Sequence, residues 1–110
     1  ASSGFFETSD ERVKTFFEKV PIDFAKLAQL KKNYFRWNSD EDQSMQIGVS
    51  AQEVQEIYPE IVNEDPETGK LSVNYSKLSV IALAAIDELY AKNLELETRL
   101  TRLENLLNNK

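Results

Sequence analysis

The sequence SVIALAAIDELYAKNLELETRLTRLENLLN, residues 79–108, decides how this chain is organised. Apolar residues recur in it at alternating steps of three and four residues, which is the heptad pattern of a coiled-coil seam. With Ile86 at position a, the a and d residues in order are Ala82, Ile86, Leu89, Asn93, Leu96, Leu100, Leu103 and Leu107. Such a helix is a rod of roughly 45 Å at about 1.5 Å per residue, too long for the preceding residues to cover. We therefore expect copies of the chain to associate through this stripe.

The residues beside the seam favour a parallel arrangement. Lys92 and Arg99 occupy g positions, whereas Glu97 and Glu104 occupy e positions. In parallel neighbours, each basic g residue then meets an acidic e residue of the next helix. Asn93 places a polar group in the seam, which lowers stability but penalises other registers.

The seam does not by itself fix the number of strands. Leucine at both a and d does not select sharply between two, three and four helices. Leu94 and Leu106 lie off the seam, which keeps open the alternative that the long helix folds back on its own domain. The sequence alone predicts a parallel oligomer of small number.

The composition restricts the chemistry that the chain can perform. It has 110 residues with no cysteine and no histidine, and its net charge is -6. The usual zinc ligands and the usual general base are therefore missing, so we expect no metal and no cofactor. The acidic balance argues against nucleic acid as a partner, and no apolar run is long enough to suggest a membrane span. Any catalysis must use Ser, Lys, Asp, Glu or Tyr.

The segment that begins at Thr8 supports two interpretations. In the first, Thr8 is the N-cap of a helix and Glu11, three residues on, is its capping-box partner. In the second, Ser9 is a nucleophile and Lys14 is its base, a dyad that needs neither His nor Cys. A lysine acts as a base only when desolvation or a nearby cation lowers its pKa well below about 10.4.

The spacing between Ser9 and Lys14 limits how they can meet. Residues five positions apart lie about 140° apart around a helix and on opposite faces of a strand. Either the backbone turns between them, or the lysine comes from a neighbouring subunit. Phe16 and Phe17 are the candidates for apolar cover over the lysine.

The middle of the chain predicts a small α+β unit with a winged-helix-like order of helices followed by a hairpin. The predicted elements are a helix over 23–31, strands over 34–37 and 46–49, a helix over 51–58, a hairpin of 61–63 with 70–73, and a last helix that starts at 75–78. Ser50 with Glu53 forms a predicted capping box, and Pro59 ends that helix. The loop over 38–44 contains Asp40, Glu41 and Asp42 but lacks the spaced ligands and central glycine of a calcium loop.

Four motifs in this order resemble the endosialidase-type C-terminal intramolecular chaperone domain. This is an autocleaving Ser/Lys peptidase family found at the ends of phage tail spikes, tail fibres and neck appendages. The motifs are SDERVK at 9–14, FRW at 35–37, IGVSAQEVQEIYPEIV at 47–62, and VNYSKL at 73–78 with AAIDEL at 84–89. The resemblance covers most of the chain.

The resemblance implies a homotrimeric chaperone that nucleates folding of an upstream fibre or spike domain and then cuts itself off. The cut would fall between Thr8 and Ser9, with Ser9 as nucleophile, Lys14 as base, and Asp10 and Arg12 as supporting residues. Chaperoning would take place in the host cytoplasm during phage assembly, before release from the virion fibre. The alternative is a trimerisation module of the same fold in which Ser9 only caps a helix.

The predicted division of the chain has three parts. They are the end of an upstream fibre or a cloning remnant over 1–8, a globular chaperone domain over 9–78 and a C-terminal parallel trimeric coiled-coil helix over 79–110.

Overall fold

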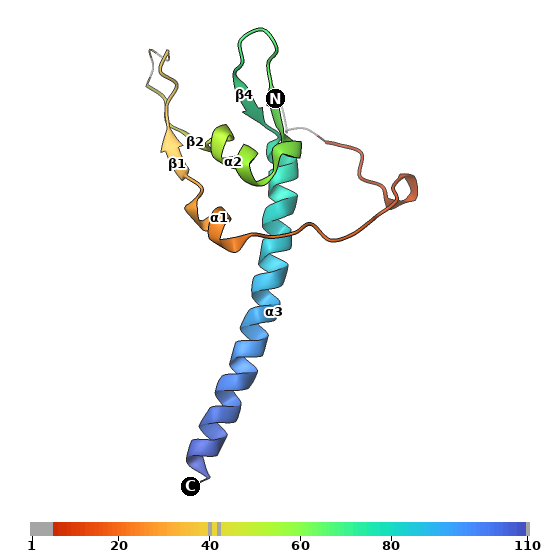
Figure 1. Cartoon of the computed structure of the whole chain (residues 1–110), viewed down its shortest axis with the longest axis vertical. Coiled ribbons are helices and arrows are strands. Elements are labelled where there is room, and N and C mark those ends of the chain that lie inside the picture. The colour runs from red at the N-terminus through yellow and green to blue at the C-terminus, as the bar shows by residue number, and fades with distance from the viewer. Residues whose placement is uncertain (1–5, 40, 42, 110) are drawn as a thin grey trace.

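The computed structural model describes residues 6–39, 41 and 43–109. It consists of a small head (residues 21–74), an arm (residues 6–20) and the long helix α3 (Tyr75–Asn108), which extends away from the head (Figure 1). The molecule measures 69 × 41 × 33 Å because α3 stands almost alone over its C-terminal half. The predictions for residues 1–5, for Asp40 and for Asp42 lie outside the described residues.

The head combines short helices with two hairpins. Its elements are α1 (Phe24–Gln29), β1 (Lys32–Phe35), β2 (Gln46–Val49), α2 (Ala51–Ile57), the 3-10 turn η2 (Pro59–Ile61), β3 (Val62–Glu64) and β4 (Leu71–Val73). Strand β1 pairs antiparallel with β2, and β3 with β4, as separate two-stranded sheets. The predicted α+β class with a long C-terminal helix is confirmed, whereas the winged-helix-like arrangement stays a prediction.

Side-chain caps set where the helices begin. Asp23, Ser50 and Asn74 each accept a hydrogen bond from the backbone N–H three residues further on, at the starts of α1, α2 and α3. The predicted capping box at Ser50 is only half formed. The Glu53 carboxylate accepts instead from the backbone N–H of Lys31 at 2.8 Å, which ties α2 to the end of α1.

The junction of α1 and β1 lies earlier in the chain than predicted. Leu30 adopts an extended conformation that ends α1, and β1 begins at Lys32 rather than at residue 34. Lys32 Nζ donates to the carbonyl oxygen of Leu27 at 2.8 Å, so it satisfies one of the last carbonyls of α1. A lysine at a helix C-terminus is stabilising there, and this local contact accompanies the earlier end of α1.

The core is small and centres on α2. Its buried residues are Leu30, Val54, Tyr58, Ile61 and Ile81. Burial and nearby carboxylates raise the pKa of the Tyr58 hydroxyl, which donates a hydrogen bond to the carbonyl oxygen of Pro21 at 2.7 Å. Ile81 comes from α3, so the long helix completes the core of the head.

A close approach between β2 and α3 brings together residues of three of the sequence motifs. A Cβ atom at Gly48 would lie 2.8 Å from both the Phe35 ring and the Tyr75 hydroxyl. The Val49 backbone N–H donates to that hydroxyl at 3.2 Å. Glycine is therefore required in β2 because the first turn of α3 packs against the strand at this point.

One flank of α3 contacts the head. Ile81 is buried, and Leu78 and Ala85 are half-buried on the same side. Further down, Lys92 Nζ lies 4.9 Å from the centroid of the Phe24 ring in α1. Lys92 is the g residue predicted to face an acidic residue of a neighbour. In this chain its ammonium group lies over the Phe24 ring of α1 instead.

The coiled-coil seam lies on a different flank and is open to solvent. Its apolar residues are exposed by between 52% (Leu89) and 67% (Leu107). The head covers c, f and g positions of α3, at Ile81, at Ala84, and at Leu78 and Ala85, so it leaves the a and d positions from Ala82 onward uncovered. The alternative in which the long helix folds back on its own domain does not describe this structure.

Candidate functional site

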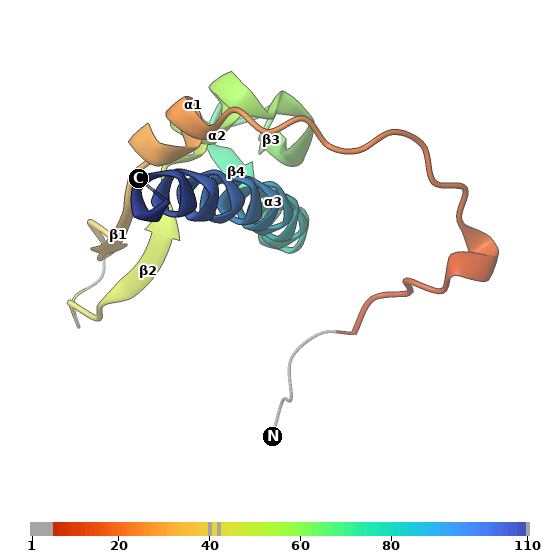
Figure 2. The same ribbon diagram turned by 90° about the horizontal axis from the view of Figure 1, so that it is seen from below.

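The arm carries the predicted dyad and is attached to the rest of the chain at both ends. It leaves the N-terminal end of α3, runs around one side of the molecule and returns to α1 (Figures 1 and 2). At its start, Ser76 Oγ donates to Glu7 Oε1 at 2.7 Å, across 69 positions of sequence. At its end, the Pro21 carbonyl accepts from Tyr58. The ends of the arm are therefore positioned by the fold, although its middle extends into solvent.

A tight turn within the arm replaces the helix start predicted at Thr8. The turn is the 3-10 helix η1 (Glu11–Val13), and its N-cap is Asp10 rather than Thr8. The Asp10 carboxylate accepts from the Arg12 backbone N–H at 2.9 Å and from Arg12 Nη2 at 2.6 Å. The interpretation of Thr8 as the N-cap is wrong. The Asp10 carboxylate takes that role and also accepts a hydrogen bond from the Arg12 guanidinium.

The Asp10–Arg12 pair keeps its charges in the folded chain. Hydrogen bonds from the Arg12 side chain, and then from its backbone, lower the pKa of the Asp10 carboxyl below its ordinary value. The same interaction raises the pKa of the Arg12 guanidinium. Both groups are solvent-exposed, so the effect on stability is small, and the pair serves to hold the turn.

The turn brings the two predicted catalytic side chains together. Lys14 Nζ donates to Ser9 Oγ at 2.6 Å. Of the two ways in which they could meet, the structure has the backbone turn within one chain, since the Lys14 backbone N–H donates to the Glu11 carbonyl at 3.3 Å. A separation of this size suits proton transfer between a hydroxyl nucleophile and an amine base.

The dyad lacks the apolar cover that a lysine base needs. Lys14 Nζ lies 5.9 Å from the centroid of the Phe16 ring, at the outer limit of a cation–π contact. Phe16 and Phe17 are 74% and 91% exposed, so the cover expected from them is not formed by this chain. Ser9 and Lys14 are themselves exposed. The pair is therefore hydrogen-bonded but lacks a desolvated environment.

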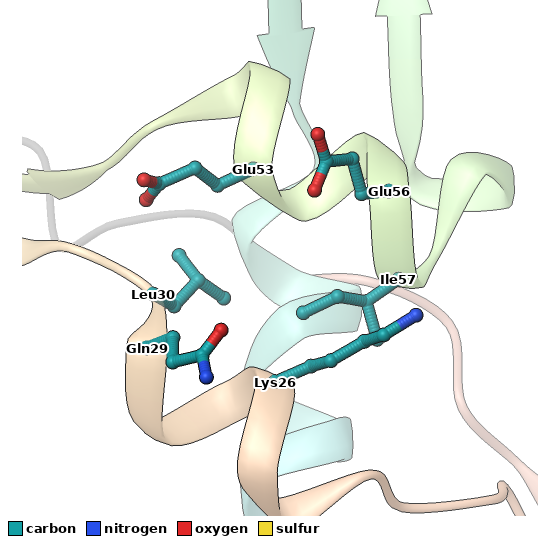
Figure 3. A pocket seen from close by; sticks show the side chains of 6 residues that line it. All are labelled: Lys26, Gln29, Leu30, Glu53, Glu56 and Ile57. Carbon is teal, nitrogen blue, oxygen red and sulfur yellow. The ribbon is translucent and has the colours of Figure 1, made fainter.

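A hollow between α1 and α2 is separate from the arm. Lys26, Gln29 and Leu30 line it from the α1 side, and Glu53, Glu56 and Ile57 line it from α2 (Figure 3). The Glu53 carboxylate is already engaged by Lys31, through its backbone N–H and through Nζ at 3.7 Å. We interpret this hollow as the gap that remains where α1 and α2 lie side by side.

The residues that the structure describes, 6–39, 41 and 43–109, bear on two further classes of site. Those residues contain no cluster of three or more acidic side chains arranged to hold a metal ion. None of the helices in the same part of the chain combines the length and the apolar character needed to cross a bilayer.

Comparison with known proteins bears on this site directly. A family model described as chaperone of endosialidase matches residues 9–63, half of the chain. The chain belongs to the chaperone of endosialidase family. The match begins at Ser9 and extends through β1, β2 and α2 into β3, so it includes the Ser9–Lys14 pair. A search of curated proteins gave no match.

Family membership confirms the resemblance that the sequence motifs indicated. It supports an intramolecular chaperone role, a phage-related function and interaction with an upstream fibre domain. Sequence reasoning missed the contact between Glu7 and Ser76, which connects the residues before Ser9 to α3. Ser76 lies within the predicted start of the last helix, and no local pattern pairs it with a residue so distant in sequence.

Proposed function

We propose that this chain is a C-terminal intramolecular chaperone that trimerises through α3 and nucleates folding of an upstream phage fibre or spike. It then releases itself by cutting between Thr8 and Ser9. Folding and release would take place in the host cytoplasm during phage assembly. The observation that carries the proposal is the 2.6 Å contact between Lys14 Nζ and Ser9 Oγ, on an exposed arm directly after the bond to be cut.

The exposed seam of α3 supports the chaperone part of the proposal. Full burial of one leucine or isoleucine side chain stabilises an assembly by about 1.5–3 kcal/mol, and each copy presents six such residues: Ile86, Leu89, Leu96, Leu100, Leu103 and Leu107. A parallel trimer would place three chain starts at one end of the bundle. The three upstream segments would then be held at high effective concentration and in register, which lowers the entropic cost of joining them.

The geometry of the arm supports the self-cleavage part. Neutral Lys14 would take the proton from Ser9 Oγ, which then attacks the Thr8 carbonyl carbon. The ring that forms contains that carbon with the N, Cα, Cβ and Oγ atoms of Ser9. The Thr8–Ser9 C–N bond breaks, Lys14 returns the proton to the departing amine, and an ester remains on Oγ. Water hydrolyses the ester, which leaves a Thr8 carboxylate and a free Ser9 amino group.

Because Ser9 and Lys14 are exposed in the single chain, assembly would come before cleavage. A lysine becomes a base when it is desolvated, and the single chain does not desolvate Lys14. Cover from an adjoining copy or from the upstream fibre would supply that environment after assembly. Cleavage would then follow folding, and the separated fibre would be kinetically trapped because its template has left.

The test uses a longer polypeptide that includes the upstream domain. Mass spectrometry of the purified protein should show a fragment that begins at Ser9. Ser9→Ala and Lys14→Ala should abolish it, while Lys19→Ala, a nearby exposed lysine of the arm, should leave it unchanged. If the unaltered protein keeps its full-length, uncleaved mass, as the Ser9→Ala variant should, the protease assignment is removed.

The exposure of Ser9 and Lys14 also favours a second candidate function. This candidate is a trimerisation module of the same fold that does not cleave itself. Its original basis, Ser9 as a helix cap, is weakened because Asp10 caps the turn. Under this candidate the upstream domain would assemble normally and stay attached to the chaperone. Assembly without cleavage in the experiment above, measured by sedimentation, would support it.

A further inference from the structure

A second apolar stripe runs along α3 beside the seam. It occupies b and e positions of the heptad, and its members are exposed by between 48% and 66%. The stripe consists of Val80, Leu83, Tyr90 and Leu94, with Asp87 among them. In the C-terminal half of the helix the same positions are polar: Glu97, Thr101, Glu104 and Asn108. The seam itself needs no such residues, so the stripe calls for a different explanation.

The stripe lies level with the head but on another side of the helix. The head contacts α3 from Tyr75 at the top to Lys92 at the bottom, and the stripe spans Val80 to Leu94. Leu78, Ala85 and Lys92 are g positions, whereas Leu83 and Tyr90 are e positions. The chain's own head therefore does not cover the stripe, although both occupy the same turns of the helix.

Coiled-coil geometry identifies what would cover it. In a parallel coiled coil, the g flank of one helix lies beside the e flank of the next. A head that sits on the g flank of its own helix is thus adjacent to the e flank of its neighbour, at the same height. We propose that the stripe of Val80, Leu83, Tyr90 and Leu94 is the docking surface for the head of the next copy of this chain. The inference rests on the parallel assembly proposed above.

The arm begins on the same flank, which connects this surface to the dyad. Ser76, which binds Glu7, is also an e position and lies about two turns above Leu83. Seen along α3, the arm leaves from the side of the helix away from α1 and the β1–β2 hairpin (Figure 2). A neighbouring head on the stripe would then border the arm. Docking would provide the apolar cover that Ser9 and Lys14 lack in one chain.

The first experiment locates the contact by cross-linking. A benzoylphenylalanine replaces Tyr90 in the full chain, and isotopically labelled and unlabelled copies are mixed before irradiation. Adducts should join position 90 to peptides from the head, residues 21–74, of another copy. Ala91, an exposed f position beside Tyr90, is the matched control and should give few of them. Adducts from position 90 that reach only its own head, or only the α3 of other copies, would overturn the inference.

The second experiment measures the energetic effect. Leu83→Glu with Tyr90→Glu should weaken self-association by at least about tenfold, because docking would bury two carboxylates against apolar surface. Ala91→Glu should change it by less than about threefold, since an f position points outward from the bundle. Equal association of the double variant and the control in sedimentation equilibrium would contradict the proposed docking.

Failure of the inference can be told apart from failure of the proposed function. A chain that sediments as a monomer at micromolar concentration would exclude both parallel assembly and the docked head. A trimer whose cross-links from position 90 avoid the neighbouring head would exclude the docking surface alone. In that second case, the chaperone proposal and the Ser9→Ala experiment would stand unchanged.

Discussion

The N-terminal and C-terminal halves of α3 follow one heptad pattern but have different surroundings. From Tyr75 to Lys92, one flank of the helix packs on the head, and Ile81 is part of the core. From Asn93 to Asn108, the described side chains of the helix are all exposed. The comparison shows that the first half is needed for one chain to fold, whereas the second half has apolar residues that association alone would bury.

The contacts of the first half with the head lie at three levels along the helix. Tyr75 meets β2 at the top, Ile81 enters the core in the middle, and Lys92 meets Phe24 at the bottom. A substitution at each level measures how strongly that contact joins rod and head. Matched substitutions in the second half show what the seam contributes without the head.

The largest effect is expected in the middle. Ile81→Ala removes a buried side chain and should lower the free energy of unfolding of the head by about 2–5 kcal/mol. Leu100→Ala, in the exposed half, should change unfolding of the dilute single chain little and instead weaken self-association. Urea denaturation and sedimentation equilibrium measure the two quantities. Equal loss of head stability in both variants would break the distinction between the halves.

A smaller effect is expected at the top. Gly48→Ala places a Cβ 2.8 Å from the Phe35 ring and from the Tyr75 hydroxyl, which should destabilise the fold by about 1–3 kcal/mol. Adding Tyr75→Phe removes one of the two clashing atoms and should recover part of the loss. Thermal unfolding of the single and double variants measures this coupling. A Gly48→Ala protein as stable as the parent would show that β2 and α3 are not in close contact.

The smallest effect is expected at the bottom. Lys92→Met keeps most of the side-chain length but removes the cation over Phe24, at a cost of about 0.5–1 kcal/mol. Arg99→Met, one heptad lower and away from the head, should not alter single-chain stability. Urea denaturation below the association range compares them. If the Lys92→Met and Arg99→Met variants unfold with the same free energy, then only apolar packing holds α1 against α3.

The sequence was most informative where local physics decides the structure. Strand β2 lies at 46–49 as predicted, because its apolar residues are followed directly by the Ser50 cap. Helix α2 ends before Pro59 as predicted, and the hairpin predicted for 61–63 with 70–73 is present with strands Val62–Glu64 and Leu71–Val73. The start of β1 and the partner of Glu53 were predicted wrongly, since both depend on Lys31 and Lys32 at the end of α1.

The candidate site also has features that the sequence predicted and features that it could not predict. The sequence singled out Ser9 and Lys14 as residue types able to form a dyad without His or Cys, and it left open whether they meet within one chain. In the structure of the single chain they meet through the η1 turn, which the Asp10 carboxylate stabilises. The exposure of the pair was not predictable, because it depends on where the arm runs relative to the head.

By itself, the sequence determined the long amphipathic helix, its apolar stripe and the Ser50 cap of α2, because periodicity and capping act between residues a few positions apart. Tertiary structure alone decided which flank of α3 the head covers. It also decided that Glu7 reaches Ser76 and that the seam stays open. These features depend on contacts between residues tens of positions apart, whose geometry follows from how the small core packs around Val54 and Ile81.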